Sequence, residues 1–360
     1  MIRLFVTTLI LSTLLAVSPE YPINESTKNF GSDYLFPVQV DGRLCFIDSL
    51  GVLKIETNLG VSLSFDDVRH NKYHFSEQLI SVPITDHSLS SFSLTKMRIV
   101  DDKGQLVFNS KYSWVGDYNN GLAQIYEYKY FLFIKVRKLF GYIDTWGSEV
   151  IEPQFHFAGP FNDGLAEVQV NNKYGFIGTS GEIVIPPIFD SASPFSEGMA
   201  VVKQGEEFGF INTEGQIVVQ PKFDNAWPFT NGVARVLVNN KMGFIGIDGN
   251  YLINPVFENA FDFQKELALV KYHDQIGYIN HTGQFVIDPQ YVDGGSFSGG
   301  LALVLIRGKY GFINKHGKLV ISNIYDDVFS YFNKGLALVM IDNEAIYINR
   351  EGKKVFNLLN

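Results

Sequence analysis

A 34-residue internal repeat organises most of this 360-residue chain. A Gly-[Phe/Tyr]-Ile motif recurs at that interval, beginning at Gly141, Gly175, Gly209, Gly243, Gly277 and Gly311. A Gly-x-Ala motif does the same, at Gly164, Gly198, Gly232 and Gly300, with Glu266 in the same phase. A proline keeps the interval too, at Pro153, Pro187, Pro221, Pro255 and Pro289. Because several independent positions keep one interval, the chain is predicted to be a tandem array of one small unit.

The pattern within each unit is that of β-strands. Glycine and proline fall inside every unit, where a helix would lose about 1 and 3 kcal/mol respectively, which excludes helical repeats of this length. In one unit, residues 166–170 alternate apolar with polar side chains, and Asn171-Asn172 suits a tight hairpin turn. Two more strands are predicted at 173–177 and 182–185, and Pro186-Pro187 ends the last because proline cannot donate to a ladder. Each unit is therefore predicted to be a three-stranded antiparallel meander followed by an aromatic-bearing loop.

Units of this size must share their apolar faces, because one alone buries too little surface to offset the entropy of ordering it. We expect the loop aromatics, such as Phe189 and Phe195, to fill the space between neighbouring units. Strand glycines such as Gly175 would admit the close approach of a ring or a backbone. The predicted fold is all-β, with an open solenoid-like stack favoured over a closed β-propeller. Propeller blades usually need four strands and about 40 residues or more.

Three segments are predicted along the chain. Residues 1–18 form a signal peptide, residues 19–120 hold degenerate repeats with insertions, and residues 121–356 form the regular array. Nine hairpin cores can be counted, of which the first two, at residues 45–48 and 98–101, are degenerate. Residues Val61–Ser93 form the largest interruption of the repeat.

The N-terminus has the layout of a secretory signal peptide, because Arg3 precedes a run of about 14 apolar or small residues. At 1.5 Å per residue this run is too short to cross a hydrocarbon core about 30 Å thick. An uncleaved signal anchor is the alternative. We expect export to the periplasm, the cell surface or the medium, with no transmembrane span after signal removal. The single cysteine, Cys45, excludes an internal disulfide framework and is expected to be buried on a strand.

The strand glycine and the two residues before it carry a family resemblance. Lys173-Tyr174-Gly175 and Lys309-Tyr310-Gly311 match a Lys-Trp-Gly core with Tyr for Trp, and Lys241-Met242-Gly243 matches it with Met. The unit thus resembles the WG repeat, also called the KWG repeat, of bacterial proteins. The resemblance covers about residues 35–356 and is strongest over 121–349. It implies that the chain binds other molecules.

No catalytic, cofactor or metal site is predicted. Dinucleotide, P-loop and Gly-x-Ser-x-Gly motifs are missing from the sequence. His70 and His74 have the spacing of a metalloprotease helix, but Asn71 stands where the glutamate is required. The other histidines, including His281 and His316, lie in different units without a common phase.

Acidic residues form one candidate binding ladder. A carboxylate follows the first loop aromatic at Asp190, Asp224, Glu258 and Asp326. Stacked units would align these side chains, which would suit a basic peptide or a divalent ion. The alternative is that each carboxylate caps its own loop by accepting backbone N–H bonds, and this interpretation is favoured.

Basic residues gather at one place, where Lys129, Lys135, Arg137 and Lys138 alternate with aromatic side chains. The pattern could serve nucleic acid or an acidic glycan. The chain as a whole carries 29 Lys and Arg against 38 Asp and Glu, a net charge of −9, which argues against a nucleic-acid partner. A long hairpin arm is the favoured interpretation.

The predicted function is that of an exported, non-catalytic repeat scaffold that binds protein partners. A glycan-binding or cell-wall-binding module acting through exposed tyrosines is one alternative. An enzyme with a site in residues 61–93 is the least favoured alternative.

Overall fold

The computed structural model describes residues 35–41, 43–60, 75–84, 96–131, 134–333 and 335–358. The predicted signal peptide, His70, His74 and most of the Val61–Ser93 interruption lie outside these residues. All described regular structure is β-strand, and none of it is a helix that could cross a membrane. The unit described below is Asp33–Asn360.

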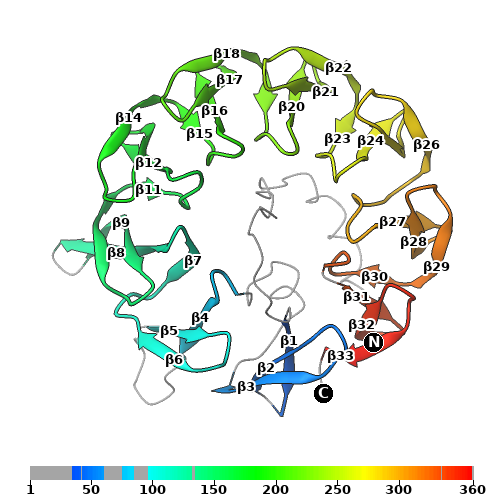
Figure 1. Cartoon of the computed structure of the whole chain (residues 1–360), viewed down its shortest axis with the longest axis horizontal. Helices are drawn as coiled ribbons and strands as arrows, with labels where there is room; N and C mark the ends of the chain where they lie inside the picture. The colour runs from blue at the N-terminus through cyan, green and yellow to red at the C-terminus, as the bar shows by residue number, and fades with distance from the viewer. Residues whose placement is uncertain are drawn as a thin grey trace, which may run out of the picture. The chain divides into compact units, whose positions relative to one another are not determined.

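Nine small antiparallel sheets follow one another around a ring in this unit (Figure 1). We number them as blades 1 to 9 in chain order. Blades 1 and 2 have three strands each, namely β1 (Phe36–Val40), β2 (Arg43–Ile47), β3 (Leu53–Gly60), β4 (Leu79–Ile84), β5 (Lys96–Asp101) and β6 (Leu106–Asn109). Blades 3 and 4 have four each, namely β7 (Val115–Asn119), β8 (Leu122–Phe131), β9 (Ile134–Asp144), β10 (Glu149–Phe155), β11 (Phe157–Ala158), β12 (Ala166–Val170), β13 (Lys173–Ile177) and β14 (Ile183–Phe189).

Blades 5, 6 and 7 repeat the four-stranded plan of blade 4. Their strands are β15 (Ser191–Ala192), β16 (Met199–Gln204), β17 (Glu207–Asn212), β18 (Ile217–Phe223), β19 (Asn225–Ala226), β20 (Val233–Val238), β21 (Lys241–Gly246), β22 (Tyr251–Phe257), β23 (Asn259–Ala260), β24 (Ala268–Tyr272), β25 (Gln275–Ile279) and β26 (Phe285–Tyr291). Blades 8 and 9 contain β27 (Leu301–Ile306), β28 (Lys309–Asn314), β29 (Leu319–Tyr325), β30 (Asp327–Val328), β31 (Leu336–Ile341), β32 (Glu344–Asn349) and β33 (Lys354–Asn357).

The array is closed, so the favoured prediction of an open solenoid was wrong and the β-propeller alternative was right. Leu358, next to β33, joins the last blade to the first. Its N–H donates to Ala345 O at 3.0 Å, and its carbonyl accepts from Gln39 N at 3.3 Å. The hydroxyl of Tyr347 also donates to Pro37 O at 3.2 Å. Side chains from both ends of the array share one buried cluster that includes Val38, Tyr347 and Leu358.

The prediction of three strands per unit was also incomplete. In blades 4 to 7 and blade 9, the fourth strand has only two residues. It comes from the loop that follows the outer strand of the preceding blade. In blade 5 this strand is Ser191–Ala192, which pairs with Lys203 and Val202 of β16. It lies on the inner side of the ring, while β18 forms the outer rim (Figure 1). A very short inner strand allows a repeat of 34 residues to complete a blade.

The two predicted turns have the expected backbone geometry. Asn171 and Asn172 have φ of 50° and 63°, as a tight type I′ hairpin requires. In blades 1 to 3 and 7 to 9, the second turn is held by an Asp or Asn whose side chain accepts backbone N–H bonds two and four residues later. Asn280 Oδ1, for example, accepts from Thr282 N and Gln284 N, both at 3.0 Å.

The strand glycines are explained by the outer strand. A Cβ at Gly175 would lie 2.4 Å from Ile185 O and 2.6 Å from Pro187 N. The pairing between β13 and β14 is shifted in register at this point, so the proline-bearing backbone bulges against the glycine. The predicted close approach is therefore that of a backbone.

The core lies between blades and is built from aromatic pairs. The Phe or Tyr of each Gly-[Phe/Tyr]-Ile motif packs on a loop Phe of the next unit. Phe176 and Phe195 have ring centroids 4.7 Å apart, and Phe210 and Phe229 are 5.0 Å apart. These rings are almost fully buried, as predicted for side chains that fill the space between units.

Candidate functional site

The four carboxylates of the predicted ladder all accept a backbone N–H from a hairpin turn. Asp190 accepts from Gly205 N at 2.9 Å and Asp224 from Asn239 N at 2.6 Å. Glu258 accepts from Asp274 N at 3.3 Å and Asp326 from Asp342 N at 3.1 Å. Each turn lies 15 or 16 residues after the acid, so the carboxylate caps the following hairpin and not its own loop.

Three of these acids also pair with the lysine of the family-like core. Lys173 pairs with Asp190, Lys309 with Asp326, and Lys241 with Glu258, the last at 3.5 Å. The hydrogen bond from Lys173 lowers the pKa of Asp190, and Lys309 does the same to the pKa of Asp326. In blade 5, Glu207 occupies the position of the lysine, opposite Asp224. The ladder thus joins neighbouring blades, since Asp190 pairs with Lys173 of blade 4 and accepts from the turn of blade 5. The described residues hold no cluster of three or more acids, histidines or cysteines that could bind a metal.

The basic segment forms a hairpin longer than those of the other blades. β8 and β9 remain paired from Leu122↔Asp144 out to Phe131↔Ile134. Lys138 is exposed, and its Nζ lies 3.8 Å from the centre of the Tyr126 ring. The favoured interpretation as a long hairpin agrees with this pairing.

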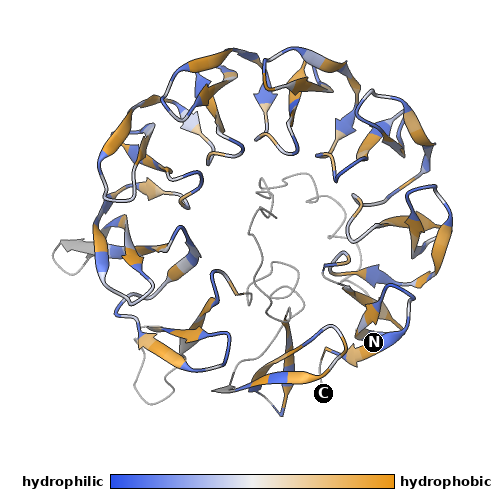
Figure 2. Ribbon diagram, in the orientation of Figure 1, coloured by the Kyte–Doolittle hydropathy of each residue, from blue (hydrophilic) through white to orange (hydrophobic). Residues whose placement is uncertain are grey.

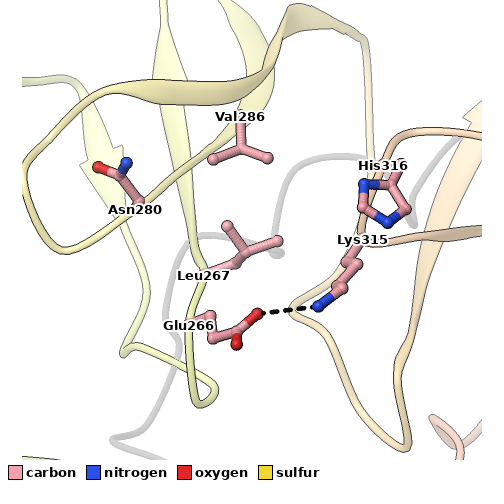
Figure 3. Close-up of a pocket in the computed structure, with 6 residues that line it drawn as sticks. All are labelled: Glu266, Leu267, Asn280, Val286, Lys315 and His316. Carbon is pink, nitrogen blue, oxygen red and sulfur yellow. Dashed lines mark hydrogen bonds and ion pairs between the residues drawn. The ribbon is translucent and has the colours of Figure 1, made fainter.

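A hollow between blades 7 and 8 is lined by residues that the sequence analysis did not predict to lie near one another. It has a volume of about 290 Å³ and is lined by Glu266, Leu267, Asn280, Val286, Lys315 and His316 (Figure 3). Glu266 and Leu267 come from the loop before β24, and Asn280 from the turn between β25 and β26. Lys315 and His316 come from the next blade, on the turn between β28 and β29. The Nζ of Lys315 lies 3.3 Å from Glu266 Oε2 across the junction of the two blades.

The loop at this hollow departs from the repeat. Glu266 replaces the glycine of the Gly-x-Ala motif, and only Lys265 before it has positive φ, at 60°. The carbonyl of Lys265 lies 2.8 Å from Nε2 of His281. That imidazole stacks on Phe263, with ring centres 4.0 Å apart. Contacts to a blade core therefore hold this side of the hollow in place.

Two charged side chains, one buried and one mostly buried, were missed by sequence reasoning. Glu167 on β12 is 1% exposed, and its Oε2 has no hydrogen-bond partner. Burial raises the pKa of Glu167 to about 8. At the same position of blade 6, Arg235 pairs with Asp262 at 2.5 Å and lies 4.8 Å from the Trp227 ring centre. The sequence did contain a sign of these two residues, because each is charged at a strand position that is Val or Leu in blades 5, 7 and 8.

A model of a known repeat matches most of this ring. The family described as "WG containing repeat" matches residues 98–128, 140–174, 174–207, 208–241, 242–274, 276–310 and 310–344. No curated protein matches the chain by sequence.

One solved structure shows the same kind of fold at low identity, and two others resemble the chain more weakly. One described as a eukaryotic initiation factor is 12% identical, with a TM-score of 0.61, over 91% of this chain and 96% of that chain. Dihydro-heme d1 dehydrogenase NirN is 12% identical over 83% and 80% of the two chains, with a TM-score of 0.42. Apo AztD from Citrobacter koseri is 12% identical over 91% and 94%, with a TM-score of 0.39. At 12% identity, the initiation-factor structure indicates that the two chains share a fold and indicates nothing about a shared function.

Proposed function

Because the chain belongs to the WG-repeat family, we propose that it is an exported, non-catalytic propeller scaffold that binds a protein partner through its outer rim. The observation that carries this proposal is an in-phase series of exposed aliphatic side chains. We call it the outer belt. It consists of the second residue of the outer strand in blades 3 to 8, namely Val150, Val184, Val218, Leu252, Val286 and Val320.

The belt is regular in both position and exposure. Each of its six side chains is between 43% and 50% exposed. The residue before it is also exposed and apolar in blades 4, 5, 6 and 8, at Ile183, Ile217, Tyr251 and Leu319. Figure 2 shows hydrophobic (orange) segments recurring on the outer strands around the rim, with hydrophilic segments between them. A single exposed valine needs no explanation, but apolar side chains repeated at one position of neighbouring blades are typical of an interaction surface.

The backbone of the outer strands favours contact through side chains. Each of these strands has an unpaired outer edge, which could accept a strand from another chain. Proline occupies that edge in blades 3 to 7, for example Pro187 and Pro221, and the inner pairing of these strands is shifted in register. Both features disfavour the addition of a strand. We therefore propose a partner that lays an apolar face, such as an amphipathic segment, against the belt.

The glycan alternative receives less support from the described surface. Among the large exposed apolar and aromatic side chains, the tyrosines are Tyr251 and Tyr331. Tyr251 lies on the outer strand of blade 6, and Tyr331 lies between β30 and β31 of blade 9. Two tyrosines on separate blades offer no repeated stacking platform for a polysaccharide.

A pull-down with matched variants tests the belt. The bait is the exported protein, incubated with envelope and secreted fractions of its own host. Val184→Lys, Val218→Lys, Leu252→Lys and Val320→Lys are combined in the belt variant. The control carries lysines at exposed polar positions of two outer strands, as Gln220→Lys on β18 and Gln290→Lys on β26. We expect one reproducible protein, retained by wild type and control and lost by the belt variant. Equal recovery by all three baits would refute the belt as the docking surface.

Export is tested separately. A fusion of residues 1–34 to a reporter that is active only outside the cytoplasm should give signal, and Leu9→Arg with Leu14→Arg should abolish it, because charge in the apolar run blocks a signal peptide. A reporter that stays inactive with the natural segment would contradict export.

A further inference from the structure

We propose that the hollow between blades 7 and 8 binds a small zwitterion, namely an α-amino acid with an aliphatic side chain. This inference concerns a small-molecule site and does not depend on a partner at the outer belt, with which it shares only Val286. The residues that carry it are Glu266, Leu267, Val286, Lys315 and His316.

The two charges of the hollow match the two charges of an α-amino acid. Glu266 Oε2 and Lys315 Nζ lie 3.3 Å apart, with side chains 74% and 57% exposed. An ion pair this exposed is weak, so a ligand can open it at little cost. The ligand ammonium would replace Lys315 as the partner of Glu266, and the ligand carboxylate would bind Lys315. Both new contacts are charge-assisted hydrogen bonds.

Lys315 and His316 lie on a turn whose backbone is held by two hydrogen bonds to one side chain. Asn314 Oδ1 accepts the backbone N–H of His316 at 3.0 Å and that of Lys318 at 3.1 Å. The turn therefore presents the Lys315 ammonium and the His316 ring together, and a ring N–H of His316 offers a second donor for the carboxylate. A preorganised pair of donors loses less entropy on binding than two independent side chains.

The remaining wall is apolar and small. The side chains of Leu267 and Val286 point toward each other between the polar groups (Figure 3). Leu267 is buried, whereas Val286 is 45% exposed. A volume of about 290 Å³ lies at the lower limit of ligand pockets, about 300 Å³, and so suits a ligand of amino-acid size. The apolar wall selects an aliphatic side chain over a charged one.

The charges of this hollow are not needed to build the fold. At the junctions of blades 4/5, 5/6 and 6/7, the position of Glu266 is Gly164, Gly198 or Gly232. The position of Lys315 is Thr213, Ile247 or His281 at the same junctions. None of these three junctions sets a carboxylate opposite a lysine at these two positions, and the same four-stranded blades flank all three. A departure from the repeat that converges from two blades on one hollow indicates a role in binding.

The test is isothermal titration of the full-length protein with L-leucine and two analogues. Leucinamide lacks the carboxylate, and 4-methylpentanoate lacks the ammonium. We expect saturable binding of leucine, and about tenfold or greater weakening for each analogue, since each loses one charge-assisted contact. Equal affinities for the three compounds, or no saturable binding of leucine, would overturn the proposal.

Variants that restore repeat residues assign the binding to this hollow. Lys315→Thr and Glu266→Gly introduce residues that the same fold carries at Thr213 and Gly232. We expect about tenfold weaker leucine binding for each. Lys315→Thr should also reduce the difference between leucine and leucinamide, because only the His316 ring then remains to bind the carboxylate. The control is Lys353→Thr, which removes an exposed pair with Glu351 in blade 9 and should bind leucine like wild type. If Glu266→Gly does not fold, leucine binding by Lys315→Thr and the comparison of leucine with its two analogues test the site without it. Leucine binding by Lys315→Thr that equals wild type refutes the site.

Discussion

Glu167 should make the propeller lose stability as the pH rises. Its carboxyl lies against Gly159, where a Cβ would come within 1.9 Å of Oε1. The hydroxyl of Tyr142 donates to Gly159 O at 2.7 Å, so it is not a donor to Glu167. With no partner for Oε2, the buried group is stable only when it carries a proton, because an unpaired buried charge is costly.

The pH window and the magnitude follow from the two pKa values of this residue. An unfolded glutamate ionises near 4.5, whereas burial raises the pKa of folded Glu167 to about 8. Below pH 4.5 both states are protonated and the stability is at its full value. Between pH 4.5 and about 8 only the unfolded state releases the proton, so the free energy of unfolding falls with rising pH. At 1.36 kcal/mol for each pH unit, the total loss is about 5 kcal/mol.

Urea unfolding of wild type and Glu167→Gln across this pH range measures the effect. Glutamine keeps the shape but cannot ionise, so the contribution of residue 167 should become independent of pH. The stability of the variant relative to wild type should therefore rise by about 5 kcal/mol from pH 4.5 to pH 8. Glu152→Gln, at an exposed position of the neighbouring blade, is the matched control and should track wild type. A constant difference between wild type and Glu167→Gln at every pH would refute the buried, protonated carboxyl.

Three further substitutions test the packing of the ring. Arg235→Ala should destabilise by about 3–5 kcal/mol in chemical denaturation, because it leaves the mostly buried Asp262 without its cation, and Trp227 fluorescence should change. Gly209→Ala should cost about 1–3 kcal/mol in the same assay, because the new Cβ would lie 2.5 Å from Val219 O. Leu358→Ala should cost about 2–5 kcal/mol and speed the reaction of Cys45 with a thiol reagent, because both side chains belong to the cluster that closes the ring. An unchanged Cys45 rate would count against closure through Leu358.

Local structure was predictable wherever one repeat contains all the groups that determine it. The pair Asn171-Asn172 specifies a hairpin turn by its tolerance of positive φ, and both residues have it. The loop phenylalanines were expected between units because no other site within 34 residues could bury them, and Phe195 packs on Phe176 as expected. These predictions needed only the period and the chemistry of each side chain.

Closure of the ring was not predictable in the same way. The fourth strand of blade 5 is Ser191–Ala192, and neither residue favours a strand by itself. Its pairing depends on β16 presenting a free edge, which is a property of the assembled blade. The contact that closes the ring joins Gln39 to Leu358, more than three hundred residues apart and outside the regular repeats. A pattern that repeats along the chain therefore specifies how neighbouring blades pack, but not whether the first and last blades pack against each other to close a ring.

The hollow between blades 7 and 8 shows how such a site can be found from a repeat sequence. Glu266 is visible as a break in the Gly-x-Ala phase, yet Lys315 lies 49 residues further on and has no local relation to it. Their contact becomes predictable once the junction geometry is known, because the Gly-x-Ala loop of blade 7 contacts the second turn of blade 8. Comparing these two positions junction by junction then singles out the pair in which a carboxylate meets a lysine. Residues that keep the phase of the repeat, such as those of the outer belt, form an extended surface, whereas a small-molecule site confined to one junction requires residues that depart from the repeat at two facing positions at once.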